Sequence, residues 1–254
     1  FSTFGEGVMS PERTDIRDTK CLVLIGSHIG ENMHNGQVQE MSDAIDKGTS
    51  IITVDPRFSV AAGKSKYWLP IKPATDLALL LAWIHVLVYE ERYDKDYVEE
   101  YTFGFEQLKE HVRNMTPEWA YGITTIEPDL IRKSAREMAN AAPAVIVHPG
   151  RHVTWYGDDT QRERAIAILN ALLGSWGRRG GYYNPESVTI PRWPHPAYPT
   201  PKRSWKDAFP DKYNLVSSSL ASGICDATIP VISEACNFKG WIVNGTNLIH
   251  TFPD

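Results

Sequence analysis

The sequence predicts an α/β protein with a Rossmann-like parallel sheet flanked by helices and a proline-rich irregular covering segment. Two observations predict the sheet. Short runs of β-branched residues and leucine are followed by small-residue turns, and these runs alternate with longer segments of helical periodicity. The third observation is the stretch 182–210, which holds seven prolines and is therefore expected to be irregular. Trp193, Tyr198 and Trp205 are interleaved with these prolines, so we expect an ordered covering loop, and long loops of this kind are usually functional.

The first structural unit lies in the segment 20–57. Its first apolar run is too short for a helix and is bounded by Gly26, which predicts a buried parallel strand. The expected elements are a strand at Cys21–Ile25, a helix at Asn35–Lys47 with Val38, Met41, Ala44 and Ile45 on its inner face, and a strand at Ile51–Val54. Gly48 is expected to end the helix. Strand, helix and strand together form a βαβ unit.

Further strands and helices follow the same alternation as far as residue 181. Two more strands are expected, at Trp68–Ile71 and Ala144–His148. The expected helices are Leu77–Glu90, two short ones around Gly104, one beginning at Pro117, Pro128–Ala142, and one that ends at Gly174. We therefore expect a Rossmann-like domain in 1–181, an irregular covering segment with a helix in 182–239, and the start of a second βαβ half in 240–254.

Composition and charge exclude several classes of function. The formal net charge is −5 and no run of Lys and Arg is longer than two, which argues against a nucleic-acid partner. The longest apolar run, Leu77–Val88, is shorter than the roughly 20 residues that a membrane span needs. The three cysteines show no zinc-binding spacing, so no metal ligand is expected among them.

Candidate binding residues follow the first two strands, in the turns 26–32 and 55–57. Ligands of parallel sheets bind beyond the carboxyl ends of the strands, so these turns predict a nucleotide-type ligand. The glycine spacing is Gly-x-x-x-Gly and not G-x-G-x-x-G, which makes an ordinary nicotinamide dehydrogenase improbable. The alternative is that Gly26 and Asp55 only form turns.

Three other stretches carry candidate residues, each with a simpler alternative. Thr75 or Asp76 can cap the following helix, and capping alone would explain both. Arg151 and His152 lie in the loop after the fourth strand, where they can be a solvated pair. The glycines of 177–181 allow close approach of a ligand, or they form a flexible linker.

The end of the chain repeats the pattern of its beginning. The run 241–243 is apolar and is followed by an Asn-Gly-Thr-Asn turn, as the first strand is followed by Gly-Ser-His. A strand without a partner would leave backbone groups unpaired. We therefore expect the chain to be a fragment of a larger protein.

Four stretches together resemble the molybdopterin oxidoreductase family of the dimethyl-sulfoxide-reductase type. They are IGSHIGEN at 25–32, VDPR at 54–57, LPIKPATDLALL at 69–80 and RAIAILNALLGSWGRRGG at 164–181. The chain looks closest to the catalytic subunit of polysulfide, thiosulfate and tetrathionate reductases. The resemblance implies that 1–181 binds molybdopterin guanine dinucleotide, as part of a molybdenum bis(molybdopterin guanine dinucleotide) cofactor. An iron–sulfur cluster is expected only in an N-terminal part that this chain lacks.

The resemblance also implies site residues. The cofactor-binding residues implied are Gly26, Ser27, His28, Asn32, Asp55, Arg57, Thr75, Asp76, Gly150, Gly180, Gly181, Gly245 and Asn247. Arg151 and His152 are expected to approach the pterin and the substrate, because a guanidinium and an imidazole suit an anionic sulfur species. The sequence departs from the family where it has His28 for the usual Asn, Ala74 for Gly and Leu248 for Pro. An imidazole can donate one hydrogen bond but lacks the paired donor and acceptor of a carboxamide.

The function implied is two-electron transfer at molybdenum with an inorganic sulfur compound, in which the protein binds and orients. The implied partners are an iron–sulfur electron-transfer subunit and a membrane anchor subunit. The implied location is periplasmic and membrane-associated through those partners, with a cytoplasmic location as the alternative. The rival function is a structural subunit of a respiratory complex that keeps the fold without molybdenum. Retention of Asp55, the Thr75-Asp76 pair and the Gly180-Gly181 pair argues for the enzyme.

Overall fold

The computed structural model describes residues 13–27, 29, 35–148, 150, 160–183, 191, 194, 242–245 and 247, and every structural statement below concerns these residues. The chain divides into two compact units, one of residues 10–185 and one of residues 1–9 and 186–254. The helices and strands described below belong to the first unit. The predicted proline-rich cover and the predicted boundaries after residues 181 and 239 stay predictions.

Four parallel strands form the sheet, which confirms the predicted fold class. They are β1 (Cys21–Ile25), β2 (Ser50–Val54), β3 (Tyr67–Leu69) and β4 (Val145–His148), in the spatial order β3-β2-β1-β4. The chain runs outward from β1 to β3 and then returns to the other side of β1 with β4. The direction of strand order therefore reverses between β1 and β4, and such a switch point is where parallel sheets bind ligands.

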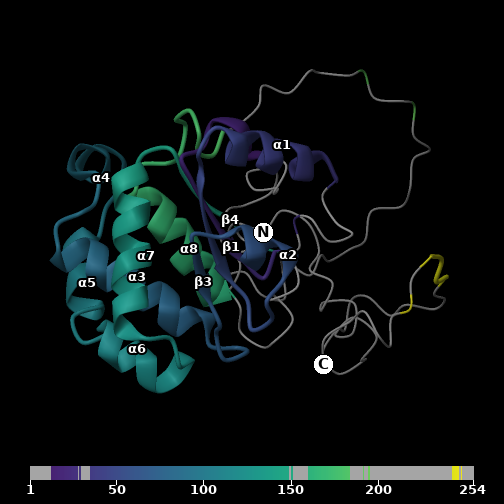
Figure 1. Cartoon of the computed structure of the whole chain (residues 1–254). Coiled ribbons are helices and arrows are strands. Elements are labelled where there is room, and N and C mark those ends of the chain that lie inside the picture. The colour runs from purple at the N-terminus through teal and green to yellow at the C-terminus, as the bar shows by residue number, and fades with distance from the viewer. Residues whose placement is uncertain are drawn as a thin grey trace. The chain divides into compact units, whose positions relative to one another are not determined.

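The helices lie close to their predicted positions (Figure 1). They are α1 (Asn35–Asp46), α2 (Val60–Lys64), α3 (Asp76–Tyr89), α4 (Lys95–Tyr101), α5 (Phe105–His111), α6 (Pro117–Thr124), α7 (Pro128–Ala141) and α8 (Thr160–Leu172), after a short 3-10 turn, η2 (Ile16–Asp18). Thr116 caps α6 by accepting a hydrogen bond from the Trp119 N–H, as its place before Pro117 predicts. Gly174, at φ 65°, follows α8.

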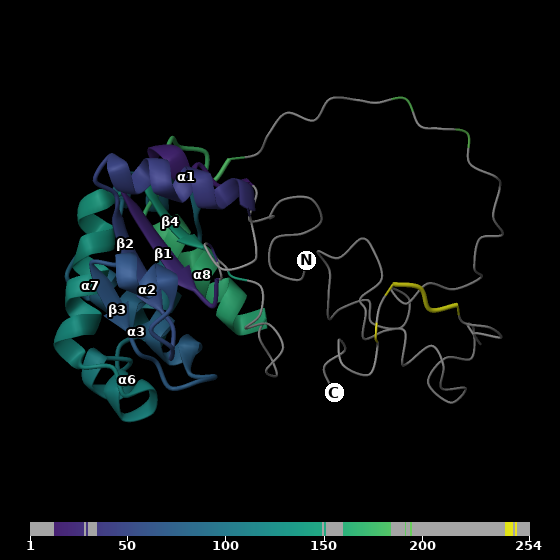
Figure 2. The same cartoon turned by 45° about the vertical axis from the view of Figure 1, so that its right-hand side comes forward.

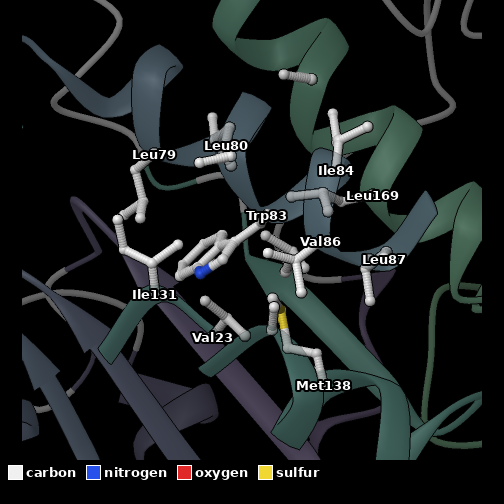
Figure 3. Close-up of a cluster of buried hydrophobic side chains, with 14 of the residues drawn as sticks. Val23, Leu79, Leu80, Trp83, Ile84, Val86, Leu87, Ile131, Met138 and Leu169 are labelled. Carbon is white, nitrogen blue, oxygen red and sulfur yellow. The ribbon is translucent and has the colours of Figure 1, made fainter. Parts of the chain in front are cut away.

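The main core lies between one face of the sheet and the long helices α3, α7 and α8. Figure 2 shows α3, α6 and α7 gathered on one side of the strands. Trp83 of α3 is fully buried at the centre, near Val23 of β1 and Met138 of α7 (Figure 3). Its indole N–H donates to Ser134 Oγ at 2.8 Å, so the polar atom of this large side chain keeps a partner.

The inner face of α1 differs from the prediction. Met41 and Ala44 are buried as expected, but Val38 is 36% exposed and Gln37 is buried in its place. The helix packs against η2, and Gln37 Nε2 donates to the Thr14 hydroxyl at 3.5 Å. The inner face therefore keeps Met41 and Ala44 but takes the polar Gln37 in its first turn, which the apolar periodicity could not indicate.

Neither a candidate membrane-spanning helix nor a candidate metal site is found among the described residues. In that part of the chain, no helix combines the length and the apolar character that a membrane crossing requires. Among the same residues, His, Cys, Asp and Glu side chains nowhere gather in threes as potential metal ligands.

Candidate cofactor-binding site

Gly26 and Gly150 meet at the switch point between β1 and β4. Both have positive φ values, 55° and 63°. A Cβ atom on Gly150 would lie 2.1 Å from the carbonyl oxygen of Ile25 and 2.8 Å from that of Gly26. Because L-residues with side chains rarely adopt such φ values and the space is filled by backbone, only glycine fits there. The structure therefore brings together two of the predicted site residues, at the edge of the sheet where ligands bind.

Ser27, the next residue, is 9% exposed. Its Oγ is buried, and no hydrogen-bond partner for it is found within the described part of the chain. A buried hydroxyl without a partner costs about 1–3 kcal/mol. A hydrogen bond to a bound ligand would remove that cost, so Ser27 fits a ligand-contacting position.

The turn after β2 holds Asp55 in a defined position. Asp55 is partly buried, and its Oδ1 accepts a hydrogen bond from the Arg57 N–H at 2.8 Å. Its own N–H donates to the Leu69 carbonyl at 3.2 Å, and its carbonyl accepts from Trp68 Nε1 at 2.8 Å. For the other carboxylate oxygen, no hydrogen bond appears among the described residues. That oxygen is available for a ligand N–H or O–H, while Arg57 itself is exposed.

The side chains of Thr75 and Asp76 make no capping hydrogen bond to α3 among the described residues, so side-chain capping does not explain these two residues. Thr75 occupies the N-cap position, but its side chain accepts no capping hydrogen bond and donates to the Lys72 carbonyl at 2.6 Å. Asp76 is the first residue of the helix and is only 9% exposed. Across the described residues its carboxylate has no hydrogen bond. A largely buried carboxylate at a helix N-terminus is favoured by the helix dipole and open to donors of a ligand.

Arg162 is a residue at this edge that the sequence analysis missed. It lies near the start of α8, is 3% exposed, and its Nη2 donates to the Ile25 carbonyl at 3.4 Å. Its Nη1 also pairs with the Glu163 carboxylate. The signal was present, since Arg162 shares the helical face of Ala165, Ile166 and Leu169, all of which are buried. A charged residue on an apolar face indicates a buried cation with a specific role.

Gly180 and Gly181 lie elsewhere, at the amino edge of the sheet. A Cβ atom on Gly180 would lie 2.6 Å from the Asp18 carbonyl oxygen and 2.7 Å from the Ala144 Cβ, and one on Gly181 would lie 2.1 Å from the Ser175 carbonyl oxygen. Asp18 and Ala144 precede β1 and β4. The structure does not bring these glycines together with the residues above, and close packing of the chain on itself explains why glycine is needed.

The structure does not relate six other predicted site residues to the carboxyl-terminal ends of the strands. His28, Asn32, Arg151 and His152 lie outside the described residues. Gly245 and Asn247 are described but belong to the unit that contains residues 186–254. Their roles therefore stay predictions.

The residues at the carboxyl edge fit the nucleotide end of a dinucleotide cofactor. Asp55 and Asp76 offer carboxylate oxygens to the N–H groups of a base or the hydroxyls of a sugar. Ser27 offers a buried hydroxyl, and the close contact of Gly150 with Ile25 and Gly26 holds the ends of β4 and β1 together beside it.

A family model and several known proteins match this chain. A family model described as molybdopterin oxidoreductase matches residues 3–238. The thiosulfate reductase molybdopterin-containing subunit PhsA of Salmonella typhimurium is 39% identical over 176 residues, which cover 69% of this chain and 23% of that protein. The F420-dependent formate dehydrogenase subunit alpha of Methanocaldococcus jannaschii is 35% identical over 182 residues, which cover 72% of this chain and 27% of that protein.

A solved structure supports the fold. The acetylene hydratase from Pelobacter acetylenicus superposes with a TM-score of 0.57 at 32% sequence identity, over 64% of this chain and 22% of that one. The chain thus spans about a quarter of the length of the relatives it matches. The family model covers far more than half of the chain, which confirms the resemblance found in the sequence. The chain belongs to the molybdopterin oxidoreductase family.

Proposed function

We propose that this chain holds the guanosine end of a molybdopterin guanine dinucleotide in the catalytic subunit of a molybdenum oxidoreductase. The observation that carries the proposal is Asp76, a largely buried carboxylate with no hydrogen bond among the described residues, at the start of a 14-residue helix. Asp55, Ser27 and the Gly26–Gly150 contact support it from the neighbouring strand ends. The cofactor supplies the redox chemistry, and the chain supplies binding and orientation.

The proposed substrate is an inorganic sulfur compound, namely polysulfide, thiosulfate or tetrathionate. The 39% identity to a thiosulfate reductase subunit supports this choice. Other relatives are named as formate dehydrogenase, acetylene hydratase and dimethyl sulfoxide reductase, so family membership alone does not select the substrate. Arg151 and His152 are the residues proposed to face the sulfur anion, because their side chains can carry positive charge.

The remaining features of the whole enzyme are proposed from family resemblance. They are the bis(molybdopterin guanine dinucleotide) form of the cofactor, an iron–sulfur cluster outside this chain, an iron–sulfur subunit and a membrane anchor as partners, and a periplasmic location. The rival function, a scaffold without molybdenum, offers no ligand to Ser27 Oγ or to the Asp76 carboxylate, for neither of which the described residues supply a hydrogen bond. Evolution of a scaffold would be free to replace both with apolar residues, which cost less to bury.

The experiment uses the complete protein that carries this chain, purified without oxygen. Molybdenum is measured by mass spectrometry, and GMP released by acid hydrolysis is measured per protein. Reduction of thiosulfate, polysulfide and tetrathionate by a reduced viologen dye is compared with oxidation of formate. We expect the purified protein to contain both molybdenum and GMP and to reduce at least one of the three sulfur compounds. Folded protein without molybdenum or GMP would support the scaffold, and activity with formate alone would overturn the sulfur substrate.

A further inference from the structure

The main chain of Asp55, which directly follows β2, is held by two hydrogen bonds to residues of β3. The regular pairing of β2 with β3 ends at Val54 and Leu69. Just beyond, the Asp55 N–H still donates to the Leu69 carbonyl, at 3.2 Å. The Asp55 carbonyl accepts its hydrogen bond from a side chain, the indole N–H of Trp68, at 2.8 Å. Trp68 thus supplies a donor at the point where the strand ladder stops.

Trp68 is itself held in place on two sides. Its backbone is part of β3, where it stands in register with Thr53 of β2. The ring of Phe58 packs edge-on against its indole, with 4.9 Å between ring centroids and an interplanar angle of 74°. Phe58 directly follows Arg57, whose N–H donates to Asp55 Oδ1 at 2.8 Å. The turn 55–57 is therefore fixed at its start by the indole and at its end by the contact of Phe58 with that indole.

This arrangement leaves the Asp55 carboxylate with little freedom. One oxygen is occupied by the Arg57 N–H, so the direction of the other follows from the position of the main chain. A binding group must be held within about 0.5 Å of its productive position by residues that are themselves locked by packing. Trp68 meets that description, since its side chain is partly buried and bonds to the main chain of Asp55 and not to its carboxylate.

We propose that Trp68 is a positioning residue that aims the Asp55 carboxylate at the nucleotide end of the cofactor. This inference rests on the proposed function. The indole does not touch the ligand in this scheme. It acts through the Asp55 main chain, and Phe58 restrains the indole by packing.

The test is a double-mutant cycle in the complete enzyme, with the rate of cofactor release as the readout. Release is followed as GMP-containing cofactor lost from the protein over time. Trp68→Phe keeps an aromatic ring beside Phe58 but removes the N–H donor. Loss of one hydrogen bond of ordinary strength is expected to speed release by about two- to tenfold. In the Asp55→Asn background, Trp68→Phe is expected to change the release rate no further, because the carboxylate it aims is gone.

Trp83→Phe is the matched control. It removes a tryptophan hydrogen bond of the same length, 2.8 Å to Ser134, but in the core and away from the turn. It is expected to lower the melting temperature while the release rate of the folded protein stays at the wild-type value. A merely structural Trp68 would behave in the same way as Trp83.

Three results would overturn the inference. In the first, Trp68→Phe releases the cofactor at the wild-type rate while Asp55→Asn releases it faster. Trp68 would then have no positioning role, and the proposed function would still hold. In the second, the fold-changes in release rate of the two single mutants multiply in the double mutant. Trp68 would then act independently of Asp55. Wild-type release from Asp55→Asn would remove the nucleotide role of the turn, and the role of Trp68 with it.

Discussion

The side chain of Asn170 bonds to both backbone groups of Val147. Its Oδ1 accepts from the Val147 N–H at 3.1 Å, and its Nδ2 donates to the Val147 carbonyl at 3.3 Å. In the described sheet β4 is an edge strand, and the amide of Asn170 takes the place of a further strand there. Because β4 leads to Gly150, this pairing links α8 to the strand end at the switch point.

We expect Asn170→Leu to lower the free energy of unfolding by about 1–3 kcal/mol, because it leaves the buried Val147 N–H without its acceptor, while the Val147 carbonyl keeps its bond from Tyr182. Tyr182→Phe is the graded comparison, since it removes only the Tyr182 hydroxyl bond to the Val147 carbonyl, at 2.5 Å. Burial raises the pKa of the Tyr182 phenol, so the hydroxyl stays protonated and keeps donating. Its loss should cost about 0.5–1.5 kcal/mol. Urea unfolding measures both, and equal stability of Asn170→Leu and wild type would contradict the role of the amide.

Asp76→Ala in the complete enzyme is expected to weaken cofactor binding by about 1.5–3 kcal/mol, the range for a hydrogen bond to a charged group. The melting temperature should change little, because Asp76 makes no capping hydrogen bond among the described residues. Molybdenum per protein and melting temperature are measured on the same sample. Asp129→Ala is the control, since Asp129 is also an acid in the first turn of a helix but is exposed. A lower melting temperature with full molybdenum in Asp76→Ala would return Asp76 to a structural role.

Gly150→Ala should destabilise the switch point. Its φ of 63° costs a residue with a side chain about 1–3 kcal/mol, and the clash with the Ile25 carbonyl oxygen adds to that. The control is Gly122→Ala in α6, where a Cβ meets nothing within 4 Å and a gain of up to about 1 kcal/mol is expected from helix propensity. Urea unfolding compares the two variants. Equal effects would show that the contact of Gly150 with β1 is not restrictive.

Glu90 is expected to make stability depend on pH. Its carboxylate accepts two hydrogen bonds from Arg136, both 2.8 Å long, and these hold the pKa of Glu90 below its ordinary value. A lowered folded-state pKa contributes stability that is fully present above the ordinary carboxyl pKa of about 4.3 and is lost as the pH falls through the lower folded value. Wild type should therefore melt about 1–3 °C above Glu90→Gln near neutral pH, a small effect because the pair is partly exposed.

The difference in melting temperature between wild type and Glu90→Gln should shrink as the pH is lowered below about 4. Melting curves at a series of pH values measure it. Glu99→Gln is the control, because Glu99 is exposed on α4 and no ion pair with it occurs among the described residues. Its pH profile should follow that of wild type. A constant gap between wild type and Glu90→Gln from neutral to acidic pH would contradict the assignment.

Part of the candidate site could be predicted from the sequence because its signals are local. Gly26 ends an apolar run, Asp55 follows the next one, and Asp76 stands at the first turn of an apolar helix. Each signal depends on a few neighbouring residues. Gly180 and Gly181 carried an equally local glycine signal, but they lie near the amino-terminal ends of the strands. A glycine pattern predicted a ligand contact there because it does not distinguish packing against backbone from packing against a ligand.

The sequence by itself determined which segments are strands and which are helices. Run length, periodicity and the glycines and prolines at their ends act within one turn or one strand. Only the tertiary structure decided the order β3-β2-β1-β4, and with it the meeting of Gly26 and Gly150. It also placed Arg162 on the Ile25 carbonyl, 137 residues away along the chain. Such contacts depend on how whole helices pack on the sheet, and no local pattern contains that information.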